Sequence, residues 1–256
     1  MKNLFKLIIL IFIISFDAYT RDIGQTEITT EDGIEVFQIE KYYLLKKNVI
    51  IVSDNFKLNA DEVKAYFDKD LYDIVKIESN GNVKLESSRG LIAKGKIVNF
   101  STKDEDIIVL GENSSLIYND IEMYSNELIK VNNISGEFNL KGKNSQLKTD
   151  SIEIFGSSIE GVYIKVNETN EIETLYVEDE KESIINTETS NMYALKAIYN
   201  KQDNLIELYE KVKIIRGGEI LTGDYAEMDT LSEKYKIKSN NNKKVKALIT
   251  NTSTDE

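Results

Sequence analysis

The acidic run Asp104-Glu105-Asp106 is the densest group of side chains in the sequence that could hold a metal ion or act in acid–base chemistry. It lacks the ligand spacing and the glycine of a calcium-binding loop, so we interpret it as a solvated turn. The pair Gly217-Gly218 lies between two strand-like runs and has neither a following helix nor a Lys-Ser/Thr pair, so it is not a phosphate-binding loop. Neither feature predicts a catalytic or metal-binding site.

The composition excludes several further classes of function. The 256 residues contain no histidine, cysteine, proline or tryptophan. Catalysis by His or Cys, thiolate metal sites and disulfide scaffolds are therefore excluded. The chain has 44 acidic and 32 basic residues, a net charge of −12, and is poor in arginine, which disfavours nucleic-acid binding. We expect a protein that is not an enzyme and needs no cofactor.

The first 20 residues have the pattern of a secretory signal peptide. Lys2 and Lys6 make a short basic start, and residues 7–16 form the apolar run LIILIFIISF. This run is too short for a membrane-spanning helix, which needs about 20 apolar residues, but it suits a signal peptide. We expect export, with cleavage after Ala18 or Thr20. An uncleaved membrane anchor is the alternative, and residues 7–16 would then remain in the mature chain.

One template recurs six times after this segment. Each copy is built around a small residue, with apolar residues two positions before it and three, five and seven positions after it. In the first copy the small residue is Ala60, preceded by Leu58 and followed by Val63, Ala65 and Phe67. Some copies fill only part of the template. The six small residues are Ala60, Ala93, Ser125, Gly156, Ala194 and Gly223, with spacings of 33, 32, 31, 38 and 29 residues.

The template predicts a strand that turns a corner at its small residue. The apolar positions before and after that residue have opposite parity, so a straight strand would place them on opposite faces. A bulge or bend restores a single inward face, and a small residue allows close backbone approach there. Short polar turns then lead into returning strands. We predict an all-β fold, a twisted, open, antiparallel jelly-roll or solenoid-like sheet of about 12–16 strands.

The sequence thus divides into three parts. We predict a signal peptide over residues 1–20, one continuous β-repeat domain over residues 21–238 and a disordered tail over residues 239–256. The fourth copy of the template carries an insertion within residues 162–182.

The apolar template positions and their neighbours are the candidate wall of an interior groove. Strands that all face one interior would join these side chains into a continuous apolar surface. Ordinary core packing accounts for the same residues, and both interpretations stay open here. The candidate groove residues are Ile50, Val52, Phe56, Leu58, Val63, Phe67, Val83, Leu85, Leu91, Val98, Phe100, Met123, Leu128, Ile154, Ile159, Met192, Leu221 and Met228.

Parts of the repeat resemble the signature of the LptA/OstA-like family. The phrases are LNADEVKAYFD at residues 58–68, MYALKAIYN at residues 192–200 and LTGDYAEMD at residues 221–229. Gly81-Asn82-Val83 is similar to that family's glycine-asparagine-valine strand start. The resemblance covers about residues 34–238, with departures at Ser125 and Gly156, which lack the aspartate that follows the small residue in the signature.

This resemblance implies a function and a location. It implies an OstA-like jelly-roll, open at one side, in the periplasm of a Gram-negative cell. Such a protein would bind the acyl chains of lipopolysaccharide in its groove and bridge the inner and outer membranes for outer-membrane assembly. The implied partners, joined through edge strands, are an LptC-like inner-membrane protein and an LptD-like outer-membrane protein. Head-to-tail self-association is a further implied contact.

Two alternatives remain at this point. The chain could be a membrane-anchored LptC-like component, or it could be a structural β-solenoid with a filled core and no ligand. The width of the groove separates the second alternative from lipid carriage, because large apolar residues that meet face to face leave no space for an acyl chain.

Overall fold

The computed structural model describes residues 22–69, 73–167, 169–240 and 244–250. The predicted signal peptide lies outside these residues. The described elements are all β-strands, joined in one 18-stranded sheet whose pairings are antiparallel. This confirms the all-β, antiparallel prediction, and the number of strands is higher than predicted.

Among the described residues, no helix is long and apolar enough to span a membrane.

Most strands are long, but the strands at the two ends of the chain have 3 or 4 residues, and residues 106–132 near its middle form four strands of 5 residues each. The number of strands exceeds the prediction because of the short end strands and because two bent strands within residues 106–132 are each split in two. The strands are β1 (Glu27–Thr29), β2 (Ile34–Phe37), β3 (Tyr42–Val52), β4 (Phe56–Phe67), β5 (Ile74–Ser87), β6 (Leu91–Ser101), β7 (Asp106–Leu110), β8 (Ser114–Tyr118), β9 (Ile121–Ser125), β10 (Leu128–Asn132), β11 (Glu137–Lys148), β12 (Ile152–Val166), β13 (Thr169–Thr187), β14 (Asn191–Asn200), β15 (Leu205–Arg216), β16 (Glu219–Asp229), β17 (Tyr235–Lys238) and β18 (Lys246–Ile249).

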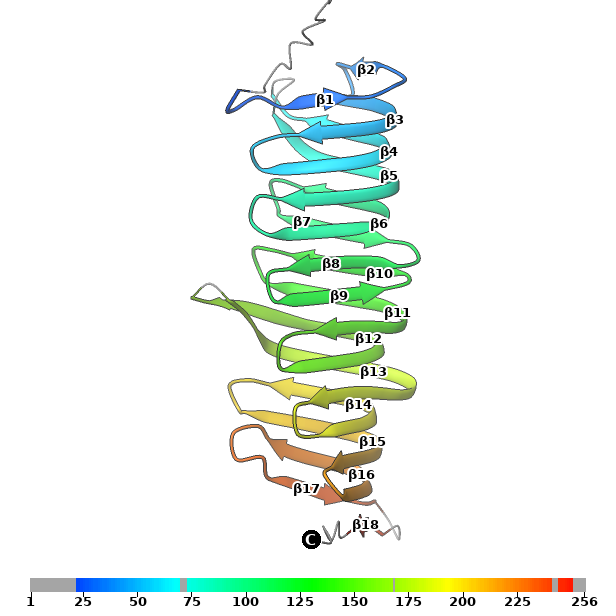
Figure 1. The fold of residues 1–256 in the computed structure, drawn as a ribbon, viewed down its shortest axis with the longest axis vertical. Helices are drawn as coiled ribbons and strands as arrows, with labels where there is room; N and C mark the ends of the chain where they lie inside the picture. Colours follow the sequence, from blue (N-terminus) through cyan, green and yellow to red (C-terminus); the bar gives the residue numbers. More distant parts are fainter. Residues whose placement is uncertain (1–21, 70–72, 168, 241–243, 251–256) are drawn as a thin grey trace, which may run out of the picture.

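Most strands bend in the middle and contribute one arm to each of two layers. The first layer runs from β2 to β17, and the second layer runs from β1 to β18. β7 and β10 belong only to the first layer, while β8 and β9 belong only to the second. Figure 1 shows the result, a column in which bent strands stack in sequence order from one end to the other.

Five of the six small residues of the template lie at corners, as predicted, but Ala93 does not, because the corner of β6 is made by Gly95 and Lys96. The strand register shifts at Ala60 in β4, at Gly156 in β12 and at Ala194 in β14. A Cβ atom on Gly156 would lie 2.8 Å from Val177 Cγ1 of the neighbouring strand. Because neighbouring strands come this close at a corner, a larger side chain would force them apart.

Buried serines, which the sequence pattern did not predict, complete the corners. The Ser79 hydroxyl donates to the Val98 carbonyl oxygen at 2.5 Å, and the Ser183 hydroxyl donates to the Ala194 carbonyl oxygen at 2.7 Å. Both serines are buried next to a break in the strand ladder. A buried carbonyl without a donor costs about 1–3 kcal/mol, so these hydroxyls stabilise the bend.

Three predicted groove residues, Ile50, Val52 and Leu128, lie outside the core that fills the space between the layers. The corner of β3 is made by Lys47 and Asn48, whose φ angles are 62° and 49°. After this corner Ile51, which is 0% exposed, faces the core and Ile50, which is 37% exposed, faces outward. In β10, Ile129 takes the inward position next to Leu128. Where consecutive residues are all apolar, the sequence does not show which of them face the core and which face outward. The predictions for these three residues were wrong for that reason.

Part of the predicted disordered tail forms a strand. β18 pairs with β16 in antiparallel register, from Lys246 opposite Thr222 to Ile249 opposite Glu219. Its four side chains are exposed. The backbone of these residues therefore extends the second layer, while their side chains add nothing to the core.

Candidate functional site

The side of the column opposite the corners is an opening, which we call the mouth, where hairpin turns of the two layers face each other. It contains two hollows between the layers. The N-terminal cleft, of about 360 Å³, is lined mainly by residues of β4 to β8 and their turns. The C-terminal cleft, of about 450 Å³, is lined mainly by residues of β12 to β15 and their turns. Both volumes fall in the range of about 300–1,000 Å³ that is typical of small-molecule sites.

The floor of the N-terminal cleft is apolar. Phe56 comes from the second layer and Phe100 from the first, and their ring centroids lie 6.3 Å apart in an edge-to-face arrangement. Ile74, Leu85 and Leu91 surround the two rings. Phe56, Ile74 and Phe100 are partly buried and pack against the main core, so the cleft is a place where the core meets solvent.

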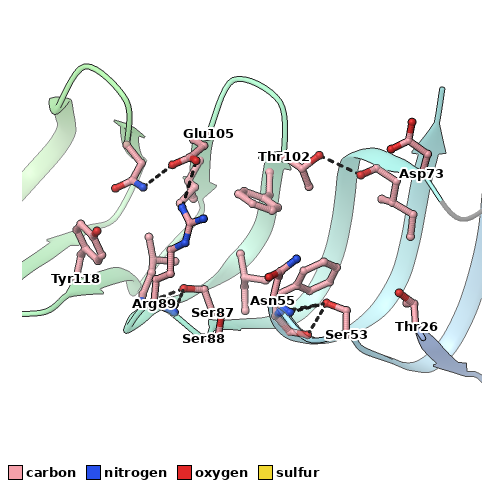
Figure 2. Close-up of a pocket in the computed structure, with 17 residues that line it drawn as sticks. Thr26, Ser53, Asn55, Asp73, Ser87, Ser88, Arg89, Thr102, Glu105 and Tyr118 are labelled. Atoms are coloured by element: carbon pink, nitrogen blue, oxygen red, sulfur yellow. Dashed lines mark hydrogen bonds and ion pairs between the residues drawn. The ribbon is translucent and has the colours of Figure 1, made fainter. Parts of the chain in front are cut away.

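The rim of the N-terminal cleft is polar and carries an ion pair across the mouth. Arg89, in a turn of the second layer, forms an ion pair with Glu105, in a turn of the first layer (Figure 2). The distance from Arg89 Nη1 to Glu105 Oε1 is 3.3 Å. Asn133 Nδ2 donates to Glu105 Oε2 at 2.6 Å. The acidic run is thus a turn, but Glu105 is paired and not merely solvated. A guanidinium has five N–H donors, so Arg89, whose side chain is 73% exposed, can also bind a second anionic group.

Direct contacts between the layers separate the two clefts. We call them the mouth bridge, formed by Tyr118 and Asp120 of the second layer and Tyr163 and Asn170 of the first. The Asn170 backbone N–H donates to Asp120 Oδ1 at 3.2 Å, and Asn170 Nδ2 donates to the Tyr118 carbonyl oxygen at 3.3 Å. The rings of Tyr118 and Tyr163 lie 6.1 Å apart. Burial raises the pKa of Tyr163 well above its ordinary value, so this ring stays neutral.

The C-terminal cleft also combines an apolar floor with a polar rim. Ile172, Tyr199 and Ile206 lie on its floor, and Lys201 and Glu171 form an ion pair on its rim. Burial raises the pKa of Tyr199, and the positive charge of Lys201 opposes this shift. Like the N-terminal cleft, this hollow can accept an apolar chain whose polar end stays in water.

Five of the predicted groove residues line a cleft: Phe56, Leu85, Leu91 and Phe100 line the N-terminal cleft, and Ile154 lines the C-terminal cleft. Most of the others lie in the interior away from both clefts: Leu58, Val63, Phe67, Val83, Val98, Met123, Ile159, Met192, Leu221 and Met228. The prediction missed cleft residues in the returning strands, namely Ile74, Ile107, Ile172, Leu175 and Ile206. Apolar alternation in those strands was the signal that could have identified them.

Within the described part of the chain, no group of three or more His, Cys, Asp or Glu side chains is arranged to hold a metal ion.

No model of a known protein family matches the sequence. No curated protein matches it significantly. Among solved structures, the chain is similar to the crystal structure of LptH, the LptA homologous periplasmic component of the conserved lipopolysaccharide transport device from Pseudomonas aeruginosa. The two share 14% sequence identity with a TM-score of 0.43, over 51% of this chain and 94% of LptH. At this identity and TM-score, the likeness says nothing about function.

Proposed function

We propose that this protein is an exported lipid carrier that binds lipopolysaccharide in the periplasm and shields its acyl chains between the two layers. The observation that carries this proposal is the N-terminal cleft, where the apolar core reaches the mouth at Phe56, Ile74 and Phe100. An acyl chain that enters there continues an apolar surface that already exists. The resemblance of the repeats to the LptA/OstA-like family supports the same proposal.

The energy of such binding is substantial. Each methylene group removed from water contributes about 0.8 kcal/mol, so a chain of a dozen carbons gains on the order of 10 kcal/mol. Binding requires no chemical step, only a dry surface of suitable size. The two clefts offer such a surface at two places along the column, on either side of the mouth bridge.

The polar head of the lipid stays outside in this proposal. The rim contains Ser53, Asn55, Ser88 and Thr102, which hydrogen-bond as well to water as to a sugar. Arg89 is the one arginine among the described residues of this rim, and it can pair with a phosphate group. The chain is strongly acidic as a whole, which would keep phosphorylated sugars from collecting on its remaining surface.

The ends of the column would be the joints of a bridge between membranes. At the N-terminal end, β2 pairs with β3 and its side chains Ile34 and Val36 are 48% and 45% exposed. An edge strand of this kind can add a strand from another chain through backbone hydrogen bonds. We propose that one end of the column joins an LptC-like protein and the other an LptD-like protein, or a second copy of this chain.

Replacing Phe100 by aspartate is expected to weaken lipopolysaccharide binding by about tenfold or more, because a carboxylate in the N-terminal cleft must be desolvated when an acyl chain enters. Binding of purified lipopolysaccharide to the exported chain measures the effect. Ile50→Asp is the matched control, since Ile50 faces outward. Equal binding by both variants, at wild-type strength, would contradict the proposal.

A ligand-free structural solenoid is the second candidate, and one observation favours it. Most of the interior is fully packed, and side chains such as Leu58, Ile77 and Ile159 are less than 2% exposed. A wild-type chain that folds but binds no lipopolysaccharide would support this candidate.

Mass spectrometry of the mature N-terminus separates a membrane-anchored component from an exported one, because an anchored chain retains residues 7–16.

A further inference from the structure

Arg89 is the one basic side chain among the described residues that line the N-terminal cleft. This side chain is 73% exposed, and its Nη1 atom donates to Glu105 Oε1 at 3.3 Å. Its other N–H groups have no acceptor among the residues that the structure describes. A guanidinium carries five N–H donors in a planar fork, so most of its binding capacity is open to solvent at the rim of an apolar cleft.

Glu105 keeps a partner if Arg89 turns to another anion. Its second oxygen, Oε2, accepts a hydrogen bond from Asn133 Nδ2 at 2.6 Å, a shorter contact than the one with Arg89. The Glu105 side chain is 31% exposed, so water can solvate it as well. An exposed ion pair with a single contact contributes little to stability. The pair with Glu105 can therefore be exchanged for a two-pronged pair with another oxyanion, which is the stronger arrangement for a guanidinium.

The remaining lining of the cleft favours one kind of ligand. Leu91 and Phe100 belong to the apolar floor of the hollow whose rim carries Arg89. Asp73, the other acidic residue of the described lining, lies towards the opposite end of the cleft from Arg89, as Figure 2 shows. A ligand that matches this arrangement has an alkyl chain for the floor and one anionic group at the end of that chain for the rim.

We infer that the N-terminal cleft selects lipids with an anionic oxygen head, a phosphate or a carboxylate, and that Arg89 exchanges Glu105 for this head when the chain enters. The lipid class of the ligand rests on the proposed function, which needs only the apolar floor, whereas the selection for an anion is additional to it. Glu105 acts as an internal competitor for the guanidinium. A charged head can replace its carboxylate, but a neutral head cannot.

The test compares three ten-carbon probes, decyl phosphate, decanoate and decanol, in titration calorimetry with the exported chain. The wild type is expected to bind the two anions about tenfold more tightly than decanol, because only an anion forms a charge-assisted pair with Arg89. The net charge of −12 disfavours anions on the rest of the surface, so this preference would identify a specific site. The tighter of the two anions shows whether the head that fits best is a phosphate or a carboxylate.

Three variants assign the preference to residues. Arg89→Gln should bring the ratio of anion to decanol affinity close to one. Glu105→Gln should raise that ratio about threefold or more, because it removes the competing charge while keeping an oxygen for Asn133. Arg216→Gln is the matched control, since Arg216 pairs with Glu233 outside the N-terminal cleft and its loss should leave the ratio unchanged.

The outcomes separate this inference from the proposed function. A wild type that binds decanol as tightly as the anions overturns the inference and leaves the proposed function standing. A preference that survives in Arg89→Gln, falls equally in Arg216→Gln, or does not rise in Glu105→Gln overturns it in the same way. A wild type that binds none of the three probes contradicts both, because the floor of the cleft then holds no alkyl chain.

Discussion

Replacing Ile51 by aspartate is expected to lower the free energy of unfolding by about 5 kcal/mol, because it places an unpaired carboxylate in the dry interior. Ile51 is 0% exposed and lies among the inward side chains of β3. Native domains are stable by only about 5–15 kcal/mol, so this variant should be largely unfolded or close to it. Urea unfolding followed by circular dichroism measures the loss.

The preceding residue provides the matched control for this substitution. Ile50 is 37% exposed and faces outward, so Ile50→Asp should cost about 1 kcal/mol or less. The two variants have the same composition and differ only in the face of the strand that carries the charge. Equal losses of stability in both would show that the strand phase after the corner of β3 is wrong.

Replacing Gly136 by alanine is expected to lower the free energy of unfolding by about 2–4 kcal/mol, the second-largest effect that we predict. Gly136 has a φ angle of 74°, and a Cβ atom there would clash with the Tyr163 carbonyl oxygen. Backbone cannot yield as easily as a flexible side chain. The variant should therefore displace Tyr163 and loosen the mouth bridge, which thermal and urea unfolding would detect.

Gly33→Ala is the control that measures the cost of backbone strain alone, without a steric clash. Gly33 has a φ angle of 93°, but a Cβ atom there would have no heavy atom within 4 Å. Alanine should therefore cost only the left-handed backbone strain, about 1 kcal/mol. If Gly136→Ala cost no more than Gly33→Ala, the close approach of Tyr163 to that turn would be refuted.

Local sequence pattern predicted the bent strands well. The change of parity after each small residue predicted the corners at Ala60, Gly156 and Ala194. These corners are visible in the sequence because a bend, where neighbouring strands approach closely, requires a small side chain at that position. The buried serines were missed, since a serine in a strand has no distinctive spacing. The left-handed corner residues of β15, Glu210 and Lys211, were missed too, because neither type is typical of positive φ.

The site was less predictable than the fold. The mouth bridge joins Asn170 to Tyr118 and Asp120, about fifty positions earlier in the chain. Such contacts depend on how the two layers are stacked. The periodicity of apolar residues within one strand carries no information about that stacking. Likewise, the predicted groove wall included Phe56 and Phe100, but the sequence pattern could not distinguish cleft residues from those in the closed core.

Site-specific photo-cross-linking tests most directly whether acyl chains enter the N-terminal cleft. A photoreactive phenylalanine analogue is placed at Phe100, inside the cleft, or at Ile50, on the outer face, and each chain is irradiated with purified lipopolysaccharide. If acyl chains enter the cleft, a lipid adduct forms at position 100 and none forms at position 50. No adduct at position 100, or equal adducts at both positions, would contradict entry at this cleft.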